Sequence, residues 1–111
     1  MDTQTHRLAG RAAIVTGGAM GIGRAIVARL AADGAAVVVA DRNVDGGAEI
    51  ARMLRDGGAK VRFVPCDVAR SDDVRAVIET TLADEGRLDV LVNDAGIPGP
   101  HGPVAELADD D

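Results

Sequence analysis

A glycine-rich run between an apolar segment and a helix-like segment constrains the fold of this chain more than any other feature. The run reads Thr-Gly-Gly-Ala-Met-Gly-Ile-Gly at residues 16–23, after the apolar residues 11–15 and before the helix-patterned residues 23–33. Glycine permits a sharp turn out of a strand, lets the backbone approach a ligand closely and allows the next helix to pack on the sheet. The pattern therefore predicts a strand, a tight turn and a helix.

This order of elements also predicts an anion-binding turn. The N-terminus of a helix presents unpaired backbone N–H groups and a partial positive charge, and both favour phosphate. Glycines also cluster in ordinary turns, and the chain holds 14 glycines among 111 residues. Because the strand before and the helix after are the context that the dinucleotide-binding motif requires, we favour a pyrophosphate-binding turn over an ordinary one.

Length and composition limit the alternatives. A chain of 111 residues allows one compact domain, residues 1–111, with a single core. Its net charge is −6 and it has no basic tract, which disfavours a nucleic-acid-binding function. No stretch approaches the roughly 20 apolar residues of a membrane span, and residues 1–10 lack the apolar core of a signal peptide. We therefore expect a cytoplasmic protein without membrane association.

Apolar segments alternate with helical patterns along the chain. Strands are predicted at residues 12–15, 36–40, 60–65 and 88–92, and helices at residues 23–33, 44–55 and 71–85. Helices between consecutive strands imply a parallel sheet with right-handed crossovers. We predict an α/β fold, a partial Rossmann-like doubly wound parallel sheet of about four strands in the order 3-2-1-4. Residues 97–111 hold three prolines and are predicted to form a loop and the start of the next helix.

Helical spacing of apolar residues predicts which face each helix buries. The predicted buried residues are Ile22, Ile26 and Leu30 in the first helix, Ile50, Met53 and Leu54 in the second, and Val74, Val77, Ile78, Thr81 and Leu82 in the third. Ser71, before two acidic residues, is predicted to be the N-cap of the third helix.

Two neighbouring residues at the end of the second strand bear on cofactor choice. Asp41 follows Gly23 by 18 residues, where a carboxylate can accept hydrogen bonds from the ribose hydroxyls of adenosine. The same charge would repel a 2′-phosphate, which favours NAD over NADP. The guanidinium of Arg42 is able to pair with such a phosphate and argues the other way. Asp41 also suits a turn or a helix N-cap, so this alternative stays open.

Taken together, these features resemble the short-chain dehydrogenase/reductase family. The matching segments are residues 16–23, Asp41, the sequence Cys66-Asp67-Val68 and the sequence Asn93-Asp94-Ala95-Gly96, in the family's order from about residue 8 onward. One position departs from the family pattern, because Asp94 stands where the family usually has Asn.

The resemblance implies an NAD(P)-binding fold and a set of cofactor contacts. It implies that Asp67 and the Val68 backbone touch the adenine, although Asp67 also suits a turn before a helix. It places Asn93, Ala95 and Gly96 on the adenosine side of the cofactor, where they also stabilise the central sheet. The full set of expected contacts is Gly17, Met20, Gly21, Ile22, Gly23, Asp41, Arg42, Asp67, Val68, Asn93, Ala95 and Gly96.

The catalytic groups of the family cannot be assigned in this chain. The family uses a Tyr as acid and base, a Lys four residues later that lowers the pKa of the Tyr, and a Ser that orients the substrate. This chain has no Tyr, its only Lys is Lys60, and its only Ser is Ser71. We expect it to be the amino-terminal, cofactor-binding half of such an enzyme, without catalytic residues of its own.

No other chemistry is indicated. Cys66 is the only cysteine, so we expect a buried, unreactive thiol and no disulfide or zinc site. Two histidines, His6 and His101, are too few for a metal site.

Two further functions remain open at this stage. One is a non-catalytic nucleotide-binding or interaction protein that a partner chain completes, and the other is half of a Rossmann-like methyltransferase. The glycine spacing and residues 93–96 argue against the methyltransferase. The strand near residues 88–93 is predicted to form a free sheet edge, which invites self-association.

Overall fold

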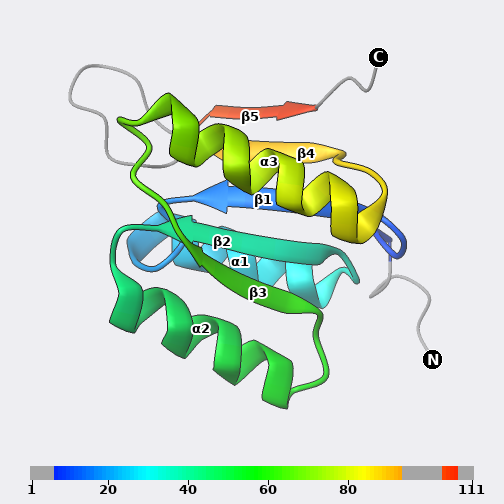
Figure 1. The fold of residues 1–111 in the computed structure, drawn as a ribbon. Helices are drawn as coiled ribbons and strands as arrows, with labels where there is room; N and C mark the ends of the chain where they lie inside the picture. The colour runs from blue at the N-terminus through cyan, green and yellow to red at the C-terminus, as the bar shows by residue number, and fades with distance from the viewer. Residues whose placement is uncertain (1–6, 94–103, 108–111) are drawn as a thin grey trace.

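Strands and helices alternate along the chain, as the apolar pattern predicts (Figure 1). The computed structural model describes residues 7–93 and 104–107. The elements are β1 (Ala12–Thr16), α1 (Gly21–Ala32), β2 (Ala36–Asp41), α2 (Val44–Asp56), β3 (Val61–Pro65), α3 (Ser71–Glu85), β4 (Val90–Asn93) and β5 (Val104–Leu107). Among the described residues, no helix has the length and apolar character needed to cross a membrane.

The sheet confirms the predicted order of the first four strands. Its order is β3-β2-β1-β4-β5, and β1 pairs in parallel with both β2 and β4. Thr16 lies beside Ala40 on one side and beside Asn93 on the other. The carboxyl ends of four parallel strands therefore meet at one edge of the sheet, which is called the carboxyl edge below.

The fifth strand corrects the prediction for the C-terminal segment. Residues 104–107 form a strand antiparallel to β4, with Val90 beside Leu107 and Asn93 beside Val104, and not a loop or a helix start. The strand satisfies backbone groups that β4 would otherwise leave unpaired. The predicted free edge at β4 is therefore wrong, and self-association through it loses its basis. The rest of the predicted loop and helix start lies outside the described residues.

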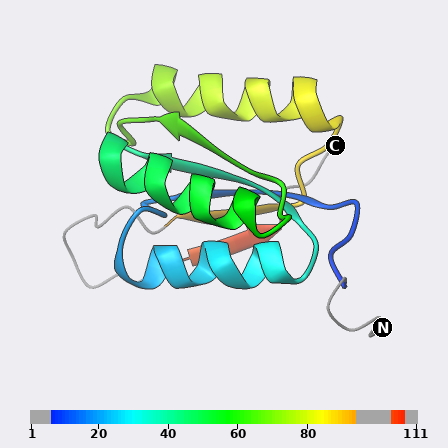
Figure 2. The same ribbon diagram turned by 90° about the horizontal axis from the view of Figure 1, so that it is seen from below.

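Helices cover the sheet on both faces. Figure 2 shows α3 on one face and α1 and α2 on the other. All five residues of β1 are buried, because β1 lies at the centre of the sheet and is covered from both sides. One core contains Val15, Val27, Val39 and Ile50, and the opposite core contains Ile14, Val38, Ala40 and Val77.

The predicted burial of Ile50, Val77 and Thr81 is confirmed, but α1 and α2 also bury small residues that the spacing of large apolar residues does not predict. The buried positions are Gly23, Val27 and Ala31 in α1, Gly47, Ile50 and Ala51 in α2, and Val77 and Thr81 in α3. Of the predicted set, Ile22, Met53 and Leu82 are exposed, while Ile26, Leu30, Leu54, Val74 and Ile78 pack beside the cores. Small residues let the helix backbone approach the sheet, as at Gly47, where a Cβ atom would overlap the ring of Phe63.

The lack of a side chain at Gly18 lets the turn after β1 pack directly against the core. It is buried, and a Cβ atom there would lie 2.9 Å from Val27 Cγ2, 3.1 Å from Val39 Cγ1 and 3.3 Å from Val15 Cγ1. These three side chains belong to the core beneath α1. Close-packed branched side chains have little room to yield, so any residue larger than glycine pushes the turn away from the sheet.

We expect Gly18→Ala to lower the free energy of unfolding by about 1–3 kcal/mol, because overpacking a filled core has this cost. The matched control is Gly57→Ala, at a position with a φ of −85° where the nearest atom to a new Cβ is 3.5 Å away. That control should change stability by no more than about 0.5 kcal/mol. Urea unfolding followed by circular dichroism measures both, and equal effects of the two variants would contradict the packing argument.

Asp89 ties the start of β4 to the start of β1. Its Oδ2 accepts hydrogen bonds from Ala12 N at 2.9 Å and from Arg87 Nε at 2.7 Å, and its Oδ1 accepts from Arg11 at 3.3 Å. The hydrogen bonds from Arg87 are the main cause that lowers the pKa of Asp89 from 3.8 to about 2, against the opposing effect of burial. Only 14% of this side chain is exposed.

This lowered pKa predicts a specific loss of stability in acid. Because the pKa is lower in the folded chain, the stabilisation is present above pH 4 and is lost as the pH falls through about 2. A shift of this size corresponds to about 2 kcal/mol. We expect the wild type to lose about that much more stability than Asp89→Asn between pH 5 and pH 2 in urea titrations. Parallel losses in the two proteins would show that Asp89 does not contribute in this way.

Candidate functional site

The turn between β1 and α1 lies at the carboxyl edge of the sheet and is held by the end of β2. Gly17 N donates a hydrogen bond to the carbonyl oxygen of Ala40 at 2.8 Å. Gly17 and Gly21 have φ values of 71° and 59°, in the left-handed region that glycine adopts without a steric cost. A Cβ atom at Gly21 would meet no atom within 4 Å, so the backbone there faces open space.

The carboxylate of Asp41 joins this turn to the start of α2. Its Oδ2 accepts a hydrogen bond from Ala19 N at 3.0 Å, and its Oδ1 accepts one from Asn43 N at 2.9 Å. Asp41 is not the N-cap of α2, because Asn43 holds that position and accepts a hydrogen bond from Gly46 N. Its contact with Asn43 N is that of a turn residue, which is one of the roles that the sequence left open. Its contact with Ala19 N was not predicted from the sequence.

A small hollow of about 50 Å³ lies beside Asp41. It is lined by Gly17, Ala40, Asp41, Arg42, Cys66 and Val68. Four of these, Gly17, Asp41, Arg42 and Val68, were expected from the sequence to share a site, and the fold brings them together from three different connections. Arg42 lines the hollow and is exposed.

Cys66 is an additional member of this hollow. Its side chain is buried, as predicted, and its N–H donates to the carbonyl oxygen of Asp41 at 3.0 Å. Burial raises the pKa of the Cys66 thiol, and the nearby carboxylates of Asp73, Asp67 and Asp41 raise it further. The thiol is therefore protonated at neutral pH and is a poor nucleophile.

Asp67 closes the turn that precedes α3. Its N–H donates to Asp73 Oδ2 at 3.0 Å, and its own carboxylate accepts from Ala69 N at 3.0 Å. The predicted N-cap at Ser71 is wrong: Arg70 is the N-cap, and Ser71 is the first helical residue. The N-cap Arg70 makes no side-chain capping hydrogen bond, and the carboxylate of Asp73 instead accepts from Asp67 N in the turn before the helix.

Thr16 couples the carboxyl ends of β1 and β4. Its Oγ1 donates a hydrogen bond of 2.9 Å to Asn93 Oδ1 and lies 3.2 Å from the carbonyl oxygen of Val92. Asn93 is exposed at the carboxyl edge, next to the turn after β1. Ala95 and Gly96, which the sequence placed beside Asn93, lie outside the described residues.

The N-terminus of α1 is electrostatically open. Its N-cap, Met20, makes no side-chain hydrogen bond, and its first turn has no acidic residue. By contrast, α2 carries Asp45 in its first turn, and α3 carries Asp72 and Asp73. The positive end of the α1 dipole is therefore not offset by a carboxylate of its own first turn, which suits an anionic ligand. Met20 and Ile22 are 65% and 62% exposed beside it.

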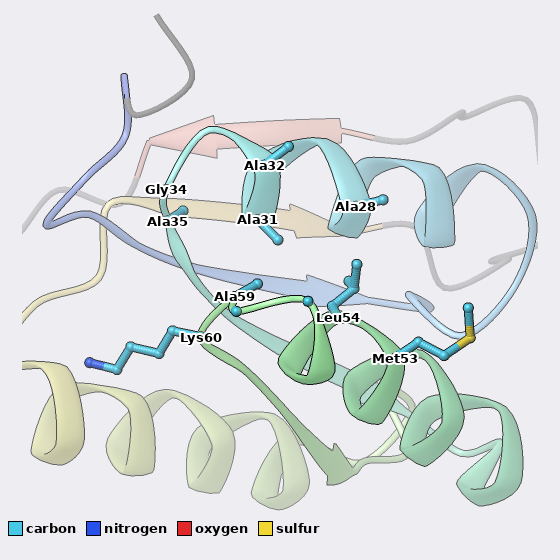
Figure 3. Close-up of a pocket in the computed structure, with 11 residues that line it drawn as sticks. Ala28, Ala31, Ala32, Gly34, Ala35, Met53, Leu54, Ala59 and Lys60 are labelled. Carbon is cyan, nitrogen blue, oxygen red and sulfur yellow. The ribbon is translucent and has the colours of Figure 1, made fainter. Parts of the chain in front are cut away.

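A larger groove, of about 500 Å³, lies between α1 and α2 (Figure 3). Its lining includes residues that follow each helix, Gly34 and Gly58 among them, so it lies near the ends of these helices that are farther from the glycine-rich turn. Small residues form most of the lining, and its one charged side chain, Lys60, pairs with Glu85 at 2.9 Å. The groove lacks the converging polar groups of a catalytic site. Within the described residues, no cluster of side chains is able to hold a metal ion.

Comparison with known proteins agrees with the geometry of the carboxyl edge. The short chain dehydrogenase family model matches residues 11–111. A 3beta-hydroxysteroid dehydrogenase of Mediterraneibacter gnavus is 44% identical over 98 residues, which cover 88% of this chain and 36% of that protein. A cis-4-hydroxycyclohexanecarboxylate dehydrogenase of Sinomonas cyclohexanicum is 46% identical over 97 residues, which cover 87% of this chain and 39% of that protein.

A solved structure gives the same result in three dimensions. The hydroxysteroid dehydrogenase from Escherichia coli matches with a TM-score of 0.76 and 31% identity, over 84% of this chain and 39% of that one. This chain thus spans about two fifths of the length of the relatives it matches. With the glycine-rich turn, the strand order and these matches in agreement, the chain belongs to the short-chain dehydrogenase family.

Proposed function

We propose that this chain is the cofactor-binding part of an NAD(P)-dependent oxidoreductase that transfers hydride between a nicotinamide and an alcohol or carbonyl group. Family membership implies a nicotinamide dinucleotide, and the relatives named above are dehydrogenases. The observation that carries the proposal is the meeting, at one sheet edge, of the glycine-rich turn, the open N-terminus of α1 and the carboxylate of Asp41.

The residues present fit an adenine dinucleotide. Gly21 leaves its backbone open to a diphosphate, and the first turn of α1, which has no side-chain cap, offers N–H donors. Asp41 offers acceptors to ribose hydroxyls at the hollow beside it. Val68 and Asp67 would contact the adenine, and Asn93 would lie on the adenosine side of the cofactor. Met20, Ile22 and Gly23 would complete the diphosphate turn, and Arg42 would lie at the ribose.

When bound, the nicotinamide supplies the hydride chemistry, and the described residues bind and orient the cofactor. They do not supply the proton transfer that accompanies hydride transfer. Tyr is absent from the sequence, Lys60 pairs with Glu85 away from the carboxyl edge, and Ser71 begins α3. We therefore propose that these 111 residues have no dehydrogenase activity of their own and depend on further residues for acid–base catalysis.

We further propose that NAD is preferred over NADP. The carboxylate of Asp41 is held by two backbone N–H groups and lines the hollow proposed for the adenosine ribose. A 2′-phosphate there would meet like charge at close range, which is unfavourable. Arg42 is the one residue lining this hollow whose charge would attract that phosphate.

A charge placed in the first turn of α1 tests the diphosphate site. Ile22 is 62% exposed, and Ile22→Asp should not harm the helix, because an acid near a helix N-terminus is favourable. The new charge should weaken NAD binding by about tenfold or more through repulsion. Met53→Asp is the control, because it adds the same charge at an exposed position of α2.

Isothermal titration calorimetry with NAD measures both variants against the wild type. Equal affinity of Ile22→Asp and the wild type would contradict the assigned site. Equal weakening by the two variants would show that net charge alone determines binding.

The ratio of NAD to NADP affinity tests the role of Asp41. We expect the wild type to bind NAD about tenfold more tightly than NADP or better, and Asp41→Ala to reduce or reverse this ratio, because a like-charge repulsion is removed. Titration of each protein with both cofactors gives the ratio. A wild type that prefers NADP would show that Arg42, and not Asp41, sets the choice.

A further inference from the structure

The contacts of Asp41 place its carboxylate within the structure of the glycine-rich turn. Ala19 N donates a hydrogen bond of 3.0 Å to Asp41 Oδ2, and Asn43 N donates one of 2.9 Å to Asp41 Oδ1. The two donors come from different connections, the turn after β1 and the turn after β2. The side chain therefore holds two loops of the carboxyl edge together without any ligand.

Ala19 depends on this contact. It is 1% exposed, so water has little access to its N–H group. A buried backbone N–H needs an acceptor, and Asp41 supplies a charged one, which makes a stronger hydrogen bond than a neutral acceptor. Ala19 is also the centre of the turn, between Gly17 and Gly21, whose left-handed φ values set the path of the backbone.

The carboxylate keeps capacity for a ligand. Its two oxygens offer about four lone-pair sites, and the two backbone N–H groups use two of them. The remaining sites are available to ribose hydroxyls on the side of the hollow. Recognition of the ribose and support of the turn are therefore compatible in one side chain.

We propose that Asp41 is a positioning residue for the diphosphate turn, in addition to its role toward the ribose. This inference rests on the proposed function, because it concerns the same cofactor site. It implies that removing Asp41 weakens the binding of a diphosphate ligand even when the ligand has no ribose hydroxyls. A role limited to the ribose predicts the opposite sign, because losing a negative charge favours an anionic ligand.

The discriminating ligand is 2′,3′-dideoxyadenosine 5′-diphosphate, compared with ADP. We expect Asp41→Ala to weaken binding of the dideoxy compound by about fivefold or more, as the loss of a hydrogen bond that shapes the site would do. Asp45→Ala is the matched control: it removes the same charge from the exposed first turn of α2. The control should leave this affinity unchanged or slightly higher.

Unchanged or tighter binding of the dideoxy compound by Asp41→Ala would overturn the positioning role and leave the proposed function intact. Failure of the wild-type chain to bind ADP or NAD would count against the proposed function itself. The two failures are thus separate results.

Amide hydrogen exchange tests the positioning role without a ligand. In the wild type, the Ala19 amide should be protected, and Asp41→Ala should speed its exchange about tenfold or more, whereas Asp45→Ala should not. An Ala19 amide that exchanges freely in the wild type, while α1 is protected, would overturn the proposal even if Asp41→Ala did not fold.

Discussion

The close approach of the turn after β1 to the sheet is the constraint on which the rest of the carboxyl edge depends. Gly18 lies against Val15, Val27 and Val39 with no room for a side chain. This fixes the depth of the turn, and the hydrogen bond from Gly17 N to Ala40 O fixes its position over β2. Because the turn is held by β2 as well as by its own helix, the pairing of β1 with β2 determines where the N-terminus of α1 points.

The sequence predicted the parallel sheet well, because each of its signals is local. The alternation of apolar runs with helical patterns predicted the strand order up to β4. The glycine-rich run and the spacing of Asp41 placed Gly17 and Asp41 at one edge, and the family resemblance added Val68. The failures involve packing and distant pairing. The buried stripe of α1 follows the small residues Gly23 and Ala31, which a search for large apolar residues passes over. The pairing of β5 with β4 depends on segments that no local pattern relates.

Individual residues of the candidate site could be predicted only where they belong to a motif with a known spacing. Gly18 was missing from the expected contacts, because its role is to pack against three side chains from β1, α1 and β2. The hydrogen bond from Ala19 to Asp41 spans 22 residues. The sequence does not show whether the carboxylate of Asp41 is free to bind a ribose or already accepts a hydrogen bond from a backbone N–H group. Such a distinction requires the path of the turn in three dimensions.

A net charge of −6 is unexpected in a chain proposed to bind a diphosphate, and the distribution of its acids accounts for this. Asp45, Asp72 and Asp73 lie in the first turns of α2 and α3, where they offset the positive ends of those helices. The first turn of α1 has none. Asp41, which contacts the turn before α1 at Ala19, uses two acceptor sites on backbone N–H groups. Local placement of charge thus outweighs net charge, since salt screens distant charges over about 8 Å at physiological ionic strength.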